Sequence, residues 1–315
     1  MDIADYTSRD ATELAALIST GQVSAAEVHR AAAAALDQVD PQLGAIAGER
    51  FDHPLDYHES GPFCGVPFAI KDLITHAAGI PQRNGSRLFG PGIAYPYDNH
   101  LMTRFRRAGL ATMAVTTSPE LGFNATTEAV AYGRPTRNPW DPERSPGGSS
   151  GGSAALVAAG ALPFAHANDG GGSIRIPAAA CGLVGLKPSR GRITAGPDHA
   201  DPLLGLGIEF AVTRTVRDCA ALFDAVHGSE PGDKYLFPAP NRPCADLITQ
   251  ELPPLRIAFS TTALDPSRGI DPECVHAVRA VADRLAAMGH HVEESTPTID
   301  AAAFDGQTSM HGAAS

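Results

Sequence analysis

The sequence predicts an α/β protein whose mixed or parallel central sheet is covered by helices. Three observations support this class. Short apolar runs typical of buried strands alternate along the chain with longer segments that have helical spacing. The chain has 315 residues, enough to bury a large core. Its 43% of hydrophobic and 19% of charged residues are ordinary for a globular protein.

Three helices and two strands are expected before residue 120. The helices are predicted at residues 11–19, 25–39 and 100–109, and the strands at residues 65–70 and 110–115. The second helix begins at a capping box, Ser24 with Glu27, and Asp40-Pro41 should end it. Lys71 and Asp72 then lie at the carboxyl end of the first strand.

The rest of the chain continues the alternation. Residues 121–146 are rich in turn residues and should be irregular, and residues 231–254 form a proline-rich surface connection. Further helices are predicted at residues 153–159, 215–226 and 271–288, and further strands at residues 180–186, 255–259 and 291–294. The connection does not divide the sequence clearly, so we expect a single domain over residues 1–315.

Charge and cysteine content limit the partners and the compartment. The net charge of −11 argues against nucleic acid or an anionic membrane as partner. The N-terminus is acidic and polar, unlike a secretory signal, and no apolar run approaches the ~20 residues needed to cross a bilayer. The five cysteines are widely spaced, so reduced, mostly buried thiols are expected. We therefore expect a cytoplasmic protein.

Two glycine–serine clusters carry the strongest chemical signal. The first, residues 147–153, contains Ser149, and the second, residues 169–173, ends in Ser173. The first satisfies the G-x-S-x-G pattern of a nucleophile elbow, but the three prolines in residues 137–146 do not form the buried strand that an elbow follows. A phosphate-binding loop needs a lysine after its glycines, and neither cluster has one.

The second cluster has a pattern suited to acyl transfer. Successive glycine N–H groups can turn toward a tetrahedral oxyanion, with the Ser173 hydroxyl beside them. A serine needs a base, and Lys71 follows a buried strand where loss of water favours the neutral amine. Ser149 can relay the proton between them. The structural alternatives are that Lys71 and Asp72 form an ion pair and that the glycines only form tight turns.

Metal chemistry has little support in the sequence. The twelve histidines are scattered and no metal-binding spacing is present. A lone histidine such as His166, in an apolar stretch, is typical of a hydrogen-bonded core position.

There are 21 arginines but only three lysines, Lys71, Lys187 and Lys234, which makes each lysine notable.

At this point the sequence resembles the amidase signature family. The matching segments occur in the family's order and are residues 65–73, 137–140, 147–153, 168–177 and 181–188. The resemblance implies the amidase-signature fold and a Ser–cis-Ser–Lys triad, with Ser173 as nucleophile, Ser149 as relay after a cis peptide bond, and Lys71 as general base. It further implies hydrolysis of a linear or cyclic carboxylic amide to an acid and an amine or ammonia through an acyl-enzyme.

The resemblance also assigns the surroundings of the triad. The backbone N–H groups of Gly170, Gly171, Gly172 and Ser173 match the family's oxyanion hole, while Ser150, Asp169 and Arg175 match supporting positions. The implied partner is a small-molecule amide, with neither cofactor nor metal, and a homodimer is common in relatives.

Two departures from the family pattern leave alternatives open. Asn168 stands where most members have threonine, and the wording of residues 165–173 and 187–192 resembles the subgroup of 6-aminohexanoate cyclic-dimer hydrolase-like amidases, which does not determine a substrate. Members generally continue well beyond residue 315, so we expect a family domain truncated at its C-terminus. The same triad would also serve a glutamine amidotransferase-type subunit, and an inactive truncated homologue is the non-enzyme alternative.

Overall fold

The computed structural model describes residues 1–263 and 269–298. They belong to two compact units, the first spanning Met1–Ile248 and the second beginning at Thr249. Each unit is described by itself. The organisation of the whole chain as a single domain stays a prediction.

The first unit is built on buried strands. β1 (Val66–Lys71) runs parallel to β4 (Leu110–Thr116), and every residue of both strands is buried. β5 (Phe164–Asp169) pairs antiparallel with β7 (Ile208–Thr213), which pairs with the short β6 (Val184–Gly185). β1 packs beside β5. The mixed α/β class is confirmed, and the buried β1 places Lys71 in the interior.

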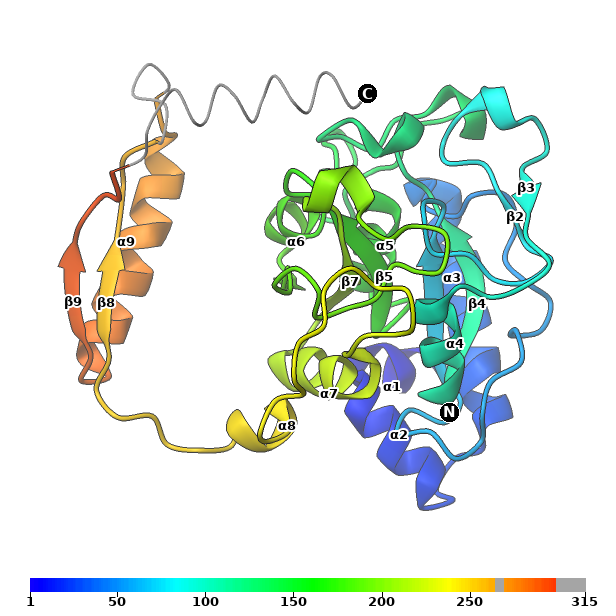
Figure 1. The fold of residues 1–315 in the computed structure, drawn as a ribbon, viewed down its shortest axis with the longest axis horizontal. Helices are drawn as coiled ribbons and strands as arrows, with labels where there is room; N and C mark the ends of the chain where they lie inside the picture. Colours follow the sequence, from blue (N-terminus) through cyan, green and yellow to red (C-terminus); the bar gives the residue numbers. More distant parts are fainter. Residues whose placement is uncertain (264–268, 299–315) are drawn as a thin grey trace. The chain divides into compact units, whose positions relative to one another are not determined.

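Helices surround these strands (Figure 1). They are α1 (Ile3–Ser8), α2 (Ala11–Ser19), α3 (Ala25–Leu43), α4 (His100–Arg107), α5 (Gly151–Ala158), α6 (Arg175–Cys181), α7 (Val216–Val226) and α8 (Cys244–Leu247). A small hairpin is formed by β2 (Pro81–Gln82) and β3 (Ile93–Ala94). The predicted helices at residues 11–19, 100–109, 153–159 and 215–226 are confirmed to within about two residues, the usual uncertainty of helix ends.

One helix boundary was predicted wrongly. α3 continues through Pro41 to Leu43 and ends at Gly44, which has φ of 61°. A proline in the last turn removes only one hydrogen bond near the end of the helix. The Asp40 carboxylate then accepts hydrogen bonds from the N–H groups of Ala45 and Ile46, which holds the chain as it leaves the helix.

The region around the second glycine cluster also differs from expectation. The predicted strand at residues 180–186 is wrong, because α6 occupies its start and only Val184–Gly185 pair as a strand. β5 and β7 were not predicted. Each carries buried polar side chains inside an apolar strand, His166 in β5 and Glu209 in β7, which obscures the hydropathy pattern.

The second unit follows the sequence prediction closely. β8 (Arg256–Phe259) and β9 (His291–Glu294) form a parallel pair, connected by α9 (Pro272–Ala287). Asp271 caps α9 by accepting a hydrogen bond from the Glu273 N–H, and Pro272 occupies the first turn, where its missing N–H costs nothing.

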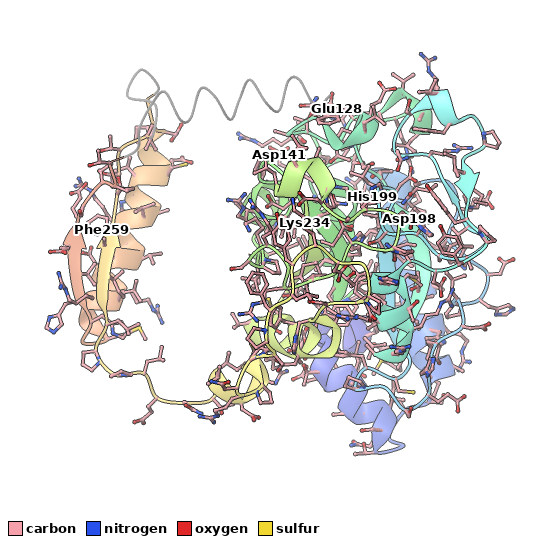
Figure 2. The ribbon with its side chains drawn as sticks, in the orientation of Figure 1. Glu128, Asp141, Asp198, His199, Lys234 and Phe259 are labelled. Carbon is pink, nitrogen blue, oxygen red and sulfur yellow. The ribbon has the colours of Figure 1, made fainter. Side chains whose placement is uncertain are left out.

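The loop after β6 is tied to the loops near β2 and β3. Asp198 accepts a hydrogen bond from the Tyr97 hydroxyl at 2.6 Å and pairs with His76 Nε2 at 3.0 Å. Figure 2 labels Asp198 and the neighbouring His199 on this loop, with Lys234 on another connection of the same unit. These contacts hold together segments 101 and 122 residues apart in the sequence.

Cysteines and membrane-spanning segments were also predicted from the sequence. All five cysteines are free thiols, and of these Cys181 and Cys219 are buried while Cys274 is exposed, so the thiols are less buried than expected. Within residues 1–263 and 269–298, no helix has both the length and the apolar character needed to cross a membrane.

Candidate active site

Lys71 lies at the end of β1 with a fully buried side chain. Its Nζ is 2.7 Å from Ser149 Oγ, 3.0 Å from Ser150 Oγ and 2.6 Å from Asn168 Oδ1. The first two partners precede α5 and the third is in β5. Three segments far apart in the sequence therefore meet at one amine.

The glycines of the first cluster allow this close approach. A Cβ at Gly148 would lie 2.6 Å from the Thr126 carbonyl oxygen, and one at Gly152 would lie 2.4 Å from Thr117 Oγ1. The Gly148–Ser149 peptide bond is cis. Side chains at these positions would push the segment away from its neighbours, so the cluster has a packing requirement beyond that of a tight turn.

The hydrogen-bond partners restrict the direction of the Lys71 lone pair. Asn168 Oδ1 can only accept a hydrogen bond. Ser150 Oγ donates its own hydrogen to the Asn168 carbonyl at 3.2 Å, so it accepts from Lys71. A neutral amine has two hydrogens, which these two acceptors use. Its lone pair is then left for the Ser149 hydroxyl, which can donate to it.

The burial of Lys71 makes its amine easier to deprotonate than that of an exposed lysine. Burial lowers the pKa of Lys71 to about 7. The negative charges of Glu209, Asp169 and Asp72 act in the opposite direction and raise that pKa. The amine is therefore present in both protonation states near neutral pH.

Asp72 is not the ion-pair partner of Lys71. Its carboxylate accepts hydrogen bonds from the N–H groups of Arg83 and Gly85, at 2.7 and 3.2 Å, and from the Tyr132 hydroxyl at 2.5 Å. Burial raises the pKa of the Asp72 carboxyl although these hydrogen bonds oppose the shift. Asp72 therefore organises the loop after β1, and the strand-end ion pair considered from the sequence is not formed.

Ser173 lies at the turn before α6 and is partly exposed. Its carbonyl accepts a hydrogen bond from the Ser150 N–H at 3.3 Å, which joins the two glycine clusters. In the described part of the chain, the Ser173 hydroxyl makes no hydrogen bond, and the N–H groups of Gly171 and Gly172 have no protein acceptor. Ser150 therefore contacts both residues: its hydroxyl contacts the Lys71 amine, and its N–H donates to the Ser173 carbonyl.

Asp169 and Arg175 brace this turn. Asp169 Oδ1 pairs with Arg175 Nη2 at 2.9 Å, and Asp169 Oδ2 accepts hydrogen bonds from the Ile174 N–H and from Arg175 Nε. Burial of Asp169 favours its neutral form, but Arg175 and the backbone donors outweigh it and lower the pKa of Asp169. A charged clamp therefore holds the glycine turn.

Three contributors to the site were not recognised from the sequence. Asn168 was seen only as a departure from a family pattern, and its contact with Lys71 Nζ has no local sequence signal. His166 was predicted as a hydrogen-bonded core residue, and it is fully buried with both ring nitrogens bonded. Glu209, its partner, had no prediction. No group of three or more His, Cys, Asp or Glu side chains in the described ranges is arranged to hold a metal ion.

Fold and site together define a class, that of α/β proteins which present a buried lysine amine to a serine hydroxyl beside a glycine-rich turn. Comparison with known proteins gives the family. The Amidase family model matches residues 17–305. The chain belongs to this family.

The relatives have named activities. The 6-aminohexanoate-cyclic-dimer hydrolase of Paenarthrobacter ureafaciens is 42% identical over 296 residues, covering 92% of this chain and 59% of that relative. A solved structure of 6-aminohexanoate cyclic dimer hydrolase gives a TM-score of 0.85 at 40% identity, over 92% of this chain and 61% of that one. A glutamyl-tRNA(Gln) amidotransferase subunit of Salinispora arenicola is 36% identical over 310 residues, 93% of this chain and 61% of its own length. The chain spans about three fifths of the length of these relatives.

Proposed function

We propose that this chain hydrolyses a linear or cyclic carboxylic amide to an acid and an amine or ammonia, through an acyl-enzyme on Ser173. The observation that carries the proposal is the 2.7 Å contact between Lys71 Nζ and Ser149 Oγ, inside a partner set that reserves the amine lone pair for that hydroxyl. A buried lysine with a pKa of about 7 is half neutral at neutral pH, as a general base requires.

Acylation transfers one proton along the two serines. Ser173 Oγ attacks the amide carbon, its proton passes to Ser149 Oγ, and the Ser149 proton passes to Lys71 Nζ. The oxygen that gains negative charge is stabilised by the N–H groups of Gly170, Gly171, Gly172 and Ser173. When the C–N bond breaks, the proton returns from Lys71 through Ser149 to the leaving nitrogen.

Deacylation uses the same groups with water as nucleophile. The Lys71–Ser149 pair accepts a proton from water, which attacks the acyl carbon, and the bond to Ser173 Oγ breaks as that oxygen regains a proton. The carboxylic acid leaves. Ser150, Asp169 and Arg175 act as supports for the two glycine turns, as their contacts suggest.

Two alternatives to the proposed amidase share the triad, a glutaminase subunit and an inactive homologue. A glutaminase subunit is favoured by the 36% identity to the amidotransferase relative, and the 42% identity to the cyclic-dimer hydrolase favours the amidase. Assays of the cyclic dimer of 6-aminohexanoate, simple linear amides and glutamine, each with the purified chain alone, separate these functions. Glutaminase activity that requires an added partner protein would favour the amidotransferase function. Absence of any activated serine would favour an inactive homologue.

The direct test is the intact mass of the protein after treatment with a fluorophosphonate, which modifies activated serines whatever their substrate. We expect one adduct on the native chain and on Ser60→Ala, a control at an exposed serine, and none on Ser173→Ala. Lys71→Ala and Ser149→Ala should each slow labelling by several orders of magnitude. These losses should not add, because the triad acts as a unit. An adduct that persists on Ser173→Ala would refute the assignment.

A further inference from the structure

The backbone N–H of Lys71 is hydrogen-bonded to a side chain and not to the backbone of a neighbouring strand. β1 and β5 pack beside each other but belong to different sheets. The Lys71 N–H, which faces β5, donates to His166 Nδ1 at 3.1 Å. Because Nδ1 accepts, the ring hydrogen is on Nε2, which donates to Glu209 Oε2 at 2.8 Å. The ring therefore connects the backbone of the amine-bearing residue to a carboxylate in β7.

Burying the Glu209 carboxylate costs free energy, because the group loses its hydration. Its side chain is fully buried, and Oε2 also accepts a hydrogen bond from Thr75 Oγ1 at 2.9 Å. Oε2 therefore has two hydrogen-bond donors, the His166 ring N–H and the Thr75 hydroxyl. Replacing a buried polar pair by apolar residues of similar volume is often neutral or stabilising, so stability alone gives little reason for this pair.

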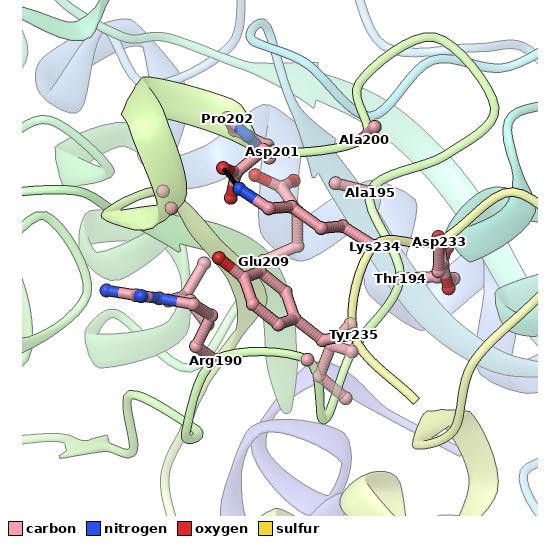
Figure 3. Close-up of a pocket in the computed structure, with 15 residues that line it drawn as sticks. Arg190, Thr194, Ala195, Ala200, Asp201, Pro202, Glu209, Asp233, Lys234 and Tyr235 are labelled. Atoms are coloured by element: carbon pink, nitrogen blue, oxygen red, sulfur yellow. Dashed lines mark hydrogen bonds and ion pairs between the residues drawn. The ribbon is translucent and has the colours of Figure 1, made fainter. Parts of the chain in front are cut away.

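Glu209 is also one of the residues around a small polar pocket. Glu209 lines it together with Thr194, Asp201 and Lys234, and the cavity has a volume of about 30 Å³ (Figure 3). In the part of the chain that the structure describes, Glu209 Oε1 has no hydrogen-bond partner. Two cations line this pocket, Lys234 and Arg190. Lys234 is paired with Asp201 at 2.5 Å, and among the described residues neither cation forms an ion pair with Glu209. The Glu209 charge is therefore not neutralised from this side by a direct contact.

Glu209 differs in this respect from the two other carboxylates that act on Lys71. Asp169 is paired with Arg175, and Asp72 is surrounded by backbone N–H donors and the Tyr132 hydroxyl. His166 is neutral when its Nδ1 accepts the Lys71 N–H. Of the charges that act on the Lys71 amine, that of Glu209 has the largest effect.

We propose that Glu209, acting through His166, is a positioning residue for Lys71: the pair holds the backbone of the lysine and places an unneutralised negative charge behind its amine. The inference rests on the proposed role of Lys71 as general base. Without this charge, a buried amine would become too weak a base to accept a proton from Ser149 efficiently. The pair thereby tunes the amine without contacting the substrate.

The test measures the titration of Lys71 directly. Because the chain has three lysines, a protein labelled with ¹³C at lysine Cε gives three signals, and Lys71→Met identifies that of Lys71. In Glu209→Gln we expect the Lys71 midpoint to fall by about one pH unit, the size of effect of one nearby charge. Glu209→Asp, which keeps the charge, should largely restore it. Lys187 is the internal reference, and Glu143→Gln, at an exposed position, is the matched control.

An unchanged Lys71 midpoint in Glu209→Gln would overturn the inference. If this variant lacks a cooperative thermal transition, His166→Gln/Glu209→Gln serves instead, because its two amides can pair with each other and one can accept the Lys71 N–H. The titration needs no catalysis. A shifted midpoint in a protein whose Ser173 is not labelled would refute the proposed function only, and a labelled Ser173 with an unshifted midpoint would refute the inference only.

Discussion

Asn168→Asp places a carboxylate where an amide now contacts the Lys71 amine. The two side chains have nearly the same shape, and Asn168 Oδ1 is 2.6 Å from Nζ, so the new charge would lie in direct contact with the lysine. The second contact of the side chain, from Asn168 Nδ2 to the Leu73 carbonyl at 3.2 Å, would be lost. The main effect is therefore electrostatic.

The expected size follows from that geometry. An opposite charge in contact raises a lysine pKa by about 1–3 units, which moves Lys71 from about 7 to about 8–10. At pH 7 the neutral fraction then falls from about one half to between about one tenth and one thousandth. Fluorophosphonate labelling of Ser173 at pH 7 should slow by about 5- to 500-fold and should recover as the pH rises past the new pKa.

The assay is the labelling rate measured from pH 5 to pH 10 for the native chain and for Asn168→Asp. Asn241→Asp, which adds the same charge at an exposed residue, is the control and should keep the native profile. A variant profile that superposes on the native one along the pH axis, or that moves to lower pH, would show that Lys71 does not act as the base.

Three further predictions concern stability. The unfolded chain binds the Lys71 proton up to about pH 10.5 and the folded chain only up to about pH 7, so the charged lysine destabilises the folded state below pH 7. Lys71→Met should therefore raise the free energy of unfolding below pH 7 by at most about 4–5 kcal/mol, less the contribution of the lost Nζ hydrogen bonds. The gain should disappear toward pH 10.5, which denaturant unfolding at several pH values measures. Gly151→Ala would place a Cβ 2.2 Å from Thr127 Oγ1 and should cost about 1–3 kcal/mol in a melt, whereas Gly269→Ala, with open space around it, should be tolerated. The pKa of Asp169 is lower in the folded than in the unfolded chain, so its ion pair with Arg175 stabilises the fold above the unfolded-state pKa, and this stabilisation is lost as the pH falls. Asp169→Asn should therefore lower the free energy of unfolding by about 1–3 kcal/mol at pH 7 and by much less under acid conditions. Equal destabilisation at pH 7 and pH 3 would contradict this.

Much of the fold was predictable because its elements have local signals. Ser24 with Glu27 forms the expected capping box, and β1 and β4 are apolar runs of strand length. The strands that escaped prediction, β5 and β7, hold His166 and Glu209 inside the core. These two residues are 43 positions apart, so nothing near either one in the sequence indicates that its polarity is satisfied.

The site was predictable in its residue types and less so in its contacts. Lys71 and Ser149 were expected to meet, and their hydrogen bond is present. The position of Asn168 at the amine depends on how β5 packs beside β1, which is a tertiary relation between separate sheets. The roles of Ser149, Ser173 and Lys71 in catalysis stay predictions until the labelling experiment is done.

All the residues assigned to proton transfer, together with Glu209, belong to the unit that spans Met1–Ile248. Their mutual contacts are made by β1, β5, β7, the segment before α5 and the turn before α6, none of which lies beyond residue 213. Substitutions beyond Ile248 therefore replace none of the side chains that make these contacts. The groups proposed to transfer the proton and the charge proposed to act on them are thus inherited together, within one compact unit of the chain.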